Sequence, residues 1–164
     1  MLQNKGVDHL ERDGIKMIAT TGGSTIKKFG EYFSRTIRKG CQIHILVASK
    51  NSAYVNDLHQ LQHAVGLTHD LNRELDDLVN FFRSQSASRA ESTTITIGRY
   101  ETQFRANMFI FDDKHCFYMP TLPPTESILS IGLEVKKMKS DGLFENCRKH
   151  FDSIWQAVEK EVIS

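Results

Sequence analysis

The first third of the chain has the pattern of a βαβ unit, and this pattern restricts the fold more than any other feature. An apolar run at residues 15–21 ends in the turn sequence 22–25, Gly-Gly-Ser-Thr. Apolar residues then recur at helical spacing from 26 to 37, and Gly40 is typical of a helix end. A second apolar run, 43–48, follows at once. Two strands joined by such a helix are expected to be parallel, so the sequence predicts an α/β protein.

The rest of the chain predicts more helices and then an antiparallel region. A polar turn at 49–52 opens a helix that Gly66 breaks, and a second helix follows before a polar loop. Alternating and apolar runs then predict four strands, of which the second and third form a hairpin around the turn 112–115. The expected segments are helices at 53–65 and 68–83, a loop at 84–92, strands at 93–98, 103–111, 116–120 and 128–135, and a final amphipathic helix from 141 that includes Val158.

Length and composition are those of one globular domain, 1–164, with residues 1–14 as a lead-in. The formal net charge of +1 gives no general argument for nucleic acid or membrane binding. No apolar run approaches the roughly 18 residues of a membrane span, and the first residues lack a signal-peptide core. Three widely spaced cysteines fit reduced thiols, so we expect a cytoplasmic protein.

Several segments in this order resemble one half of the phospholipase D superfamily, as found in stand-alone bacterial domains. The segments are the strand and turn at 15–25, the helix-to-strand step at 38–47, the strand ending Ile110-Phe111-Asp112-Asp113, and a closing helix with Phe144 and Trp155. The resemblance covers residues from about 14 to 160. It implies a mixed sheet flanked by helices. It also implies a homodimer, because the family's active site needs two halves that face each other.

The chain departs from the family at the residues that carry its chemistry. The family motif is His-x-Lys-x-x-x-x-Asp, with His as the nucleophile that attacks phosphorus. Here Arg105 stands at the His position, Asn107 at the Lys position and Asp112 at the Asp position. A guanidinium group stays protonated and cannot attack phosphorus. The resemblance therefore implies a degenerate domain without the family's usual reaction.

Two polar turns and one strand supply the candidate binding residues. The turns follow parallel strands, and ligands in open α/β sheets bind at such strand ends, where helix N-termini attract anions. The residues are Gly22, Gly23, Ser24, Thr25, Ser49, Lys50, Asn51, Arg105, Asn107 and Asp112. Each also has a structural explanation. Ser24 or Thr25 can cap the helix, Arg105 and Asn107 can face solvent, and Asp112 can form the turn.

Three functions are compatible with these residues. The first is a non-catalytic module that recognises a phosphate-bearing small molecule, nucleic acid or partner. The second is a homodimeric phosphodiesterase or nuclease with an altered mechanism, and the third is a protein-interaction domain. No cofactor or metal site is expected: His59 and His63 are four residues apart on a helix, but no third ligand accompanies them.

Overall fold

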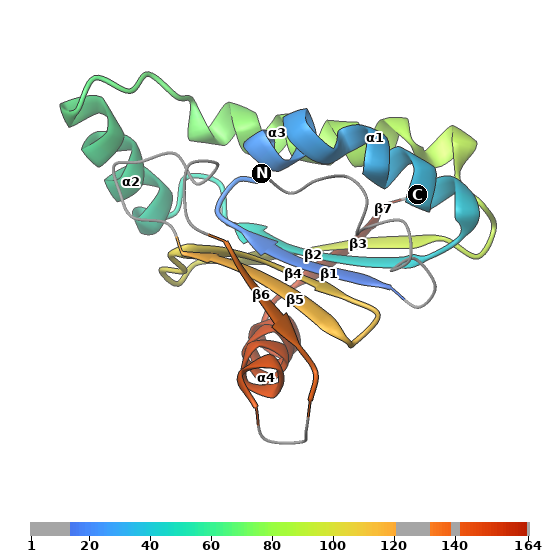
Figure 1. Cartoon of the computed structure of the whole chain (residues 1–164). Helices are drawn as coiled ribbons and strands as arrows, with labels where there is room; N and C mark the ends of the chain where they lie inside the picture. Colours follow the sequence, from blue (N-terminus) through green and yellow to red (C-terminus); the bar gives the residue numbers. More distant parts are fainter. Residues whose placement is uncertain (1–13, 121–131, 139–141, 164) are drawn as a thin grey trace.

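The computed structural model describes residues 14–120, 132–138 and 142–163, and it shows an α/β fold. A seven-stranded mixed sheet lies between helices on its two faces (Figure 1). The strand order is β6-β5-β4-β1-β2-β3-β7. No helix among the described residues is both long and apolar enough to cross a lipid bilayer.

The parallel part of the sheet confirms the predicted βαβ unit. β1 (Ile15–Ala19), β2 (Gln42–Ala48) and β3 (Thr94–Tyr100) are parallel neighbours. α1 (Gly23–Lys39) connects the first two strands, and Gly40 follows its last residue with a φ of 89°. The connection from β2 to β3 contains α2 (Ala53–Ala64), α3 (Leu71–Ser84) and the short 3-10 helix η1 (Ser86–Ser88).

The second half of the chain adds antiparallel strands at both edges. β4 (Ala106–Phe111) pairs with β1, and β5 (His115–Pro120) forms the expected hairpin with β4. β6 (Leu133–Lys136) pairs with β5 at one edge of the sheet. After α4 (Leu143–Ala157), β7 (Lys160–Ile163) pairs with β3 at the other edge.

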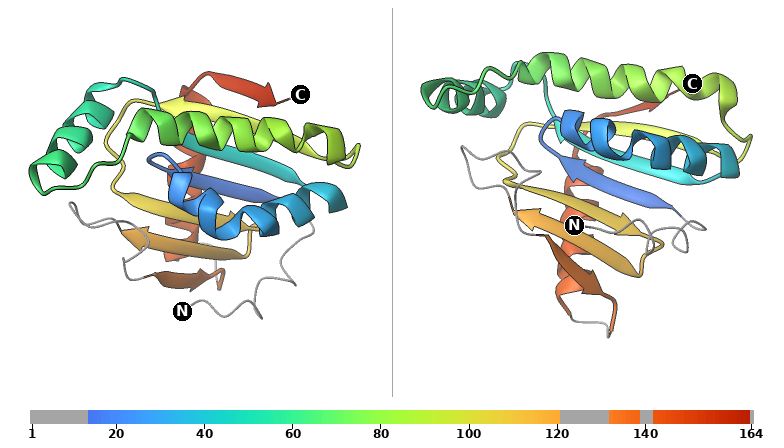
Figure 2. Two further views of the ribbon diagram at one scale, coloured as in Figure 1. Left: turned by 90° about the horizontal axis from the view of Figure 1, so that it is seen from above. Right: turned by 45° about the horizontal axis from the view of Figure 1, so that its top comes forward.

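Two apolar cores fill the spaces between the three layers, one on each face of the sheet. α1 and α3 lie side by side over one face, and α4 crosses the opposite face (Figures 1 and 2). Phe33, Leu75 and Phe82 belong to the core on the first face, and Phe144 and Phe151 to the core on the second. α2 extends beyond the sheet, and only Tyr54 and Val55 of this helix are buried.

Several predicted boundaries were wrong. α4 ends at Ala157 instead of including Val158, and β7 was not predicted. α3 begins at Leu71 rather than 68, and the expected loop 84–92 contains η1. Of the strand expected at 128–135, only Leu133–Lys136 is observed, while 128–131 and the lead-in up to residue 13 lie outside the described residues.

Candidate ligand-binding site

Most of the predicted site residues meet at one end of the strands, where the parallel strands have their carboxyl ends. The carboxyl ends of β1 and β2 are adjacent there, and the Ala48 amide donates to the Thr20 carbonyl at 2.9 Å. β4 runs antiparallel to β1, with Met108 opposite Ile18, so its first residues lie where β1 ends. The turns 20–25 and 49–52 therefore share this end of the strands with Arg105 and Asn107.

Asp112 does not belong to this group, and its place in the candidate site was wrong. It follows Phe111, which pairs with Ile15 at the amino end of β1. The Asp112 amide donates to the Gly14 carbonyl at 3.0 Å, and its Oδ1 accepts from the Gly14 amide at 3.3 Å. Its φ of 52° is typical of a turn residue. Asp112 thus fixes the β4–β5 turn to the start of β1, at the opposite end of the strands from the other candidate residues.

The start of α1 is buried at Gly22, Gly23 and Thr25, and it has no side-chain cap. Gly22 is the N-cap with a φ of 74°, so the expected cap at Ser24 or Thr25 was wrong. A Cβ atom on Gly22 would lie 2.2 Å from Cδ1 of Leu78, which leaves room only for glycine. The amides of Gly23, Ser24 and Thr25 form no hydrogen bond with any described residue. Buried amides normally have a partner, so this helix start has donors for water or a ligand.

A carboxylate lies beside this helix start without bonding to its amides. The Thr21 hydroxyl donates to Oε2 of Glu74 at 2.6 Å, and Nδ1 of His69 lies 3.6 Å from Oε1. A Cβ atom on Gly23 would lie 2.9 Å from Cβ and Cγ of Glu74, so the two residues are in close contact. The negative charge is favourable next to the positive end of the helix dipole, and it would repel a second anion.

Asn107 is a second polar group at this end of the strands, and its side chain bonds to no other described residue. It is 7% exposed. Phe109 and Phe111 of the same strand belong to the core beneath α1 and α3, and alternation places Asn107 on that face. Arg105 also belongs to this alternating set, but it is exposed, and its Nη2 donates only a long 3.4 Å bond to Gln103.

The turn after β2 has mainly structural contacts. Nζ of Lys50 forms an ion pair with Asp76 at 2.6 Å. Asn51 has a φ of 58°, and its amide and side chain both bond to Asn72 at 3.0 Å. Ser52 caps α2 by accepting from the Val55 amide. The charge of Lys50 is thus neutralised, and Asn51 joins the start of α2 to α3.

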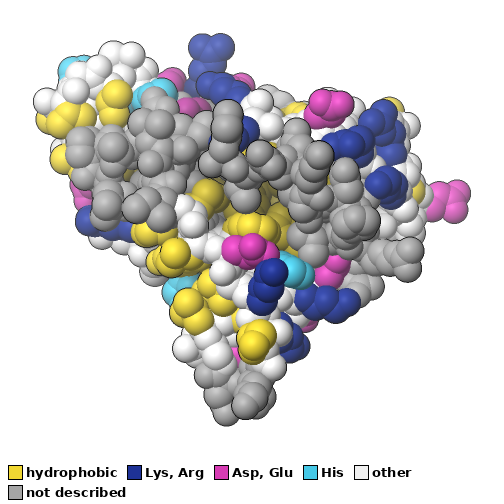
Figure 3. All heavy atoms as spheres, viewed as in Figure 1, with side chains coloured by type: hydrophobic (Ala, Val, Ile, Leu, Met, Phe, Trp, Pro, Cys, Tyr) yellow, Lys and Arg dark blue, Asp and Glu magenta, His cyan; other side chains and the backbone are white. Residues whose placement is uncertain are grey.

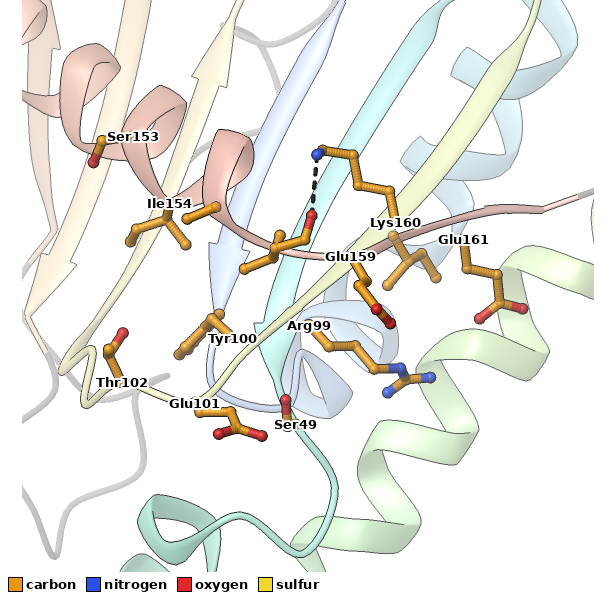
Figure 4. Close-up of a pocket in the computed structure, with 13 residues that line it drawn as sticks. Ser49, Arg99, Tyr100, Glu101, Thr102, Ser153, Ile154, Glu159, Lys160 and Glu161 are labelled. Atoms are coloured by element: carbon orange, nitrogen blue, oxygen red, sulfur yellow. Dashed lines mark hydrogen bonds between the residues drawn. The ribbon is translucent and has the colours of Figure 1, made fainter.

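A groove with a volume of about 790 Å³ lies next to this turn, between the end of β3 and the join of α4 with β7 (Figure 4). Ser49 is the predicted site residue that lines it, together with Arg99, Tyr100, Glu101, Thr102, Ser153, Ile154, Glu159 and Lys160. The Tyr100 hydroxyl donates to the Ala19 carbonyl at 3.0 Å, and burial raises the pKa of this phenol. Lys160 donates to the Val158 carbonyl. The sequence did not predict this groove, because Val158 was expected to belong to the final helix and β7 was not predicted.

A smaller hollow of about 280 Å³ lies at the opposite end of the strands, next to Asp112. Lys16 projects here between Asp152 at 3.1 Å and Asp113 at 3.6 Å, and Arg148 pairs with Asp152 and Glu145. The Arg148 guanidinium holds the pKa of Glu145 below its usual value. Because the cations are paired with acids, this network mainly connects α4 to the sheet.

No group of three or more possible metal ligands occurs in the part of the chain that the structure describes. His59 and His63 are both exposed on α2.

No model of a known protein family matches the chain, and no curated protein is detectably similar to it. The resemblance to the phospholipase D superfamily therefore stays a prediction, whereas the α/β fold rests on the structure itself.

Proposed function

We propose that this protein is a non-catalytic module that binds a phosphate-bearing ligand at the start of α1. The observation that carries the proposal is the helix start itself, where Gly23 and Thr25 are buried, Ser24 is half-buried, and the amides of all three have no partner among the described residues. A buried donor without a partner is unfavourable by about 1–3 kcal/mol, so these amides favour a ligand with several acceptor oxygens. A phosphate group meets this requirement, and the helix dipole favours its charge.

Nearby residues support recognition of such a ligand. The buried amide of Asn107 supplies a further donor at the same end of the strands. Arg105 is exposed at the start of β4, where its guanidinium can bind a second phosphate or a carboxylate in bidentate fashion. Glu74 opposes binding and limits affinity, because its carboxylate already lies against Gly23.

One observation favours the alternative of a phosphodiesterase with an altered mechanism. His69 lies 3.6 Å from Glu74 at the same helix start, and a carboxylate can orient an imidazole for nucleophilic attack. In this alternative a second copy completes the site, as the phospholipase D resemblance implies. Turnover of bis-p-nitrophenyl phosphate or single-stranded DNA that is lost in both His69→Ala and Arg105→Ala would establish this reading and overturn the binding-only one.

The binding proposal is tested with inorganic phosphate and a panel of nucleotides, using the shift in melting temperature and calorimetric titration. We expect binding by the wild type and weaker binding by Asn107→Leu. Glu74→Gln should bind phosphate several-fold more tightly, because it removes a negative charge next to the anion. Asn80→Leu, at an exposed position of α3, is the matched control and should bind like wild type. Absence of binding by both wild type and Glu74→Gln would favour the third function, a protein-interaction domain.

We also propose a reducing, cytoplasmic environment. Cys41, Cys116 and Cys147 are all buried, and none of them forms a disulfide in the described part of the chain.

A further inference from the structure

β6 is an edge strand, and no other described strand pairs with its outer side. It is the last strand of the sheet, and β5 is its neighbour. The Lys137 amide donates to the Lys114 carbonyl at 2.8 Å, which makes 114 and 137 a hydrogen-bonded pair. In an antiparallel ladder such pairs alternate. The backbone groups of Leu133 and Val135 therefore point toward β5, and those of Glu134 and Lys136 point outward.

We propose that β6 pairs antiparallel with β6 of a second copy of this chain, around a two-fold axis at Val135. In this register Glu134 lies opposite the partner's Lys136, and Lys136 lies opposite the partner's Glu134. Both residues present outward backbone groups, so each facing pair forms backbone hydrogen bonds in both directions. The two sheets then become one continuous sheet, without dependence on the anion site at α1.

The charges of β6 select this register over its neighbours. Side chains of Glu134 and Lys136 are 45% and 61% exposed, and their Oε1 and Nζ atoms lie 3.7 Å apart within one strand. A register centred on Glu134 would place two glutamates opposite each other, and one centred on Lys136 would place two lysines opposite each other. Like charges directly opposite destabilise a strand pair. In a register shifted by one residue, the outward backbone groups of one copy would face residues of the other copy whose backbone groups point toward its own β5.

Exposed apolar side chains next to β6 favour a second copy over a polar partner. Leu133, Met138 and Leu143 are 49%, 86% and 58% exposed. Figure 3 shows hydrophobic side chains between charged ones on the face where β6 lies. Leu133 shares the α4 side of the strand with Val135, so a partner strand would cover both residues.

The interface is small, and this sets the expected affinity. A four-residue strand with a few apolar neighbours buries less than the roughly 1,200 Å² of a stable interface. We therefore expect a transient dimer with a dissociation constant on the order of micromolar or weaker. The opposing interpretation is that Glu134, Lys136 and Lys137 keep the edge free, since charged edge strands resist pairing. That interpretation predicts a monomer at every concentration.

Analytical ultracentrifugation of the full chain, from low micromolar to submillimolar concentration, separates these interpretations. We expect a concentration-dependent dimer for the wild type and at least tenfold weaker association for Glu134→Lys. The double exchange Glu134→Lys with Lys136→Glu should restore association, because it restores opposite charges across the axis. Glu91→Lys makes the same charge change at an exposed position before β3 and is the matched control.

Circular dichroism establishes that each variant is folded, and a chemical cross-link gives an independent measurement. Glu134→Cys combined with Lys136→Cys should give a disulfide-linked dimer on a non-reducing gel, since hydrogen-bonded antiparallel pairs have a suitable Cα separation. The proposal is overturned by a wild-type monomer at all concentrations. It is equally overturned by a dimer that Glu134→Lys leaves unchanged, or by folded cysteine variants that do not cross-link.

Discussion

His44 lies in β2, an inner strand of the sheet, and its imidazole is half-buried among charged and aromatic groups from two other elements. The ring stacks on Trp155 of α4 with 4.7 Å between centroids and 21° between planes. Lys16 and Asp152 are the charges that act on it. Burial lowers the pKa of His44, the Lys16 ammonium lowers it further, and the Asp152 carboxylate partly opposes both effects. The imidazole is therefore neutral in the folded protein at neutral pH.

This lowered pKa makes stability depend on pH in one direction. The unfolded chain has the ordinary histidine pKa of about 6.5 and binds the proton first as the pH falls. Stability should therefore be highest above about pH 6.5 and decrease toward the lower pKa of the folded state. His44→Gln cannot gain this charge, so its melting temperature should fall less than that of the wild type between neutral and mildly acidic pH. His63→Gln, at an exposed position, is the control, and equal slopes for wild type and His44→Gln would contradict the prediction.

Single residues also show where the sequence was informative. Gly22 and Gly23 were predicted as candidate binding residues, and in the structure they lie in close contact with the α3 side chains Leu78 and Glu74. The partners of Lys50 and Asn51 could not be predicted, because Asp76 and Asn72 lie on α3, 26 and 21 residues further along the chain. Nothing in the local sequence indicates which surface side chain a turn residue will meet.

At the scale of elements, the position where α4 ends decides how the last strand reaches the sheet. Val158 follows the helix and packs on Gly98 of β3, together with Trp155. Amphipathic periodicity predicted a helix through Val158 because an apolar residue at that position fits a helix and an extended join equally well. A glycine inside a strand indicates a close approach, but the sequence does not say of which segment.

Gly98→Ala tests this contact between elements. An added Cβ would lie 2.8 Å from Cγ2 of the half-buried Val158 and 3.0 Å from Cδ2 of the fully buried Leu46. We expect a loss of about 1–3 kcal/mol in the free energy of unfolding, measured by denaturant titration. Gly132→Ala is a suitable control, since among the described residues its Cβ would meet only Met119, at 3.4 Å. A Gly98→Ala variant as stable as wild type would show that the α4–β7 join yields without strain.

For the whole molecule, contacts between neighbours in sequence were predictable and closure of the sheet was not. The βαβ unit and the β4–β5 hairpin follow from local periodicity and turn residues, and both are confirmed. β7 pairs with β3, which is far away in the sequence, and its sequence Lys-Glu-Val-Ile does not alternate polar and apolar residues. The candidate site was likewise predictable only in part. The turns after the parallel strands β1 and β2 lie at the same end of the sheet, as expected from their positions in the sequence. Asp112 was assigned to that end because the sequence does not give the direction of β4 relative to β1.

β7 gives the whole-molecule prediction, because it closes the sheet with alternating buried and exposed residues. Ile163 is 1% exposed, belongs to the core beneath α1 and α3, and accepts a hydrogen bond from Arg89 through its carbonyl at 2.7 Å. Val162, its neighbour, is 63% exposed. Ile163→Ala should lower the free energy of unfolding by about 2–4 kcal/mol, because it removes apolar contacts and leaves a cavity. Val162→Ala should change it by less than about 0.5 kcal/mol.

The same pair of variants tests whether β7 is part of the cooperative unit or an appended strand. If it is integral, Ile163→Ala should lower the denaturant midpoint with an unchanged slope, and a probe of the distant β4–β5 hairpin should report the same midpoint as far-ultraviolet circular dichroism. The reason is that Ile163 pairs with Ile95 in the same sheet that contains β4. Equal effects of Ile163→Ala and Val162→Ala would show instead that β7 separates from β3 before the rest of the sheet unfolds.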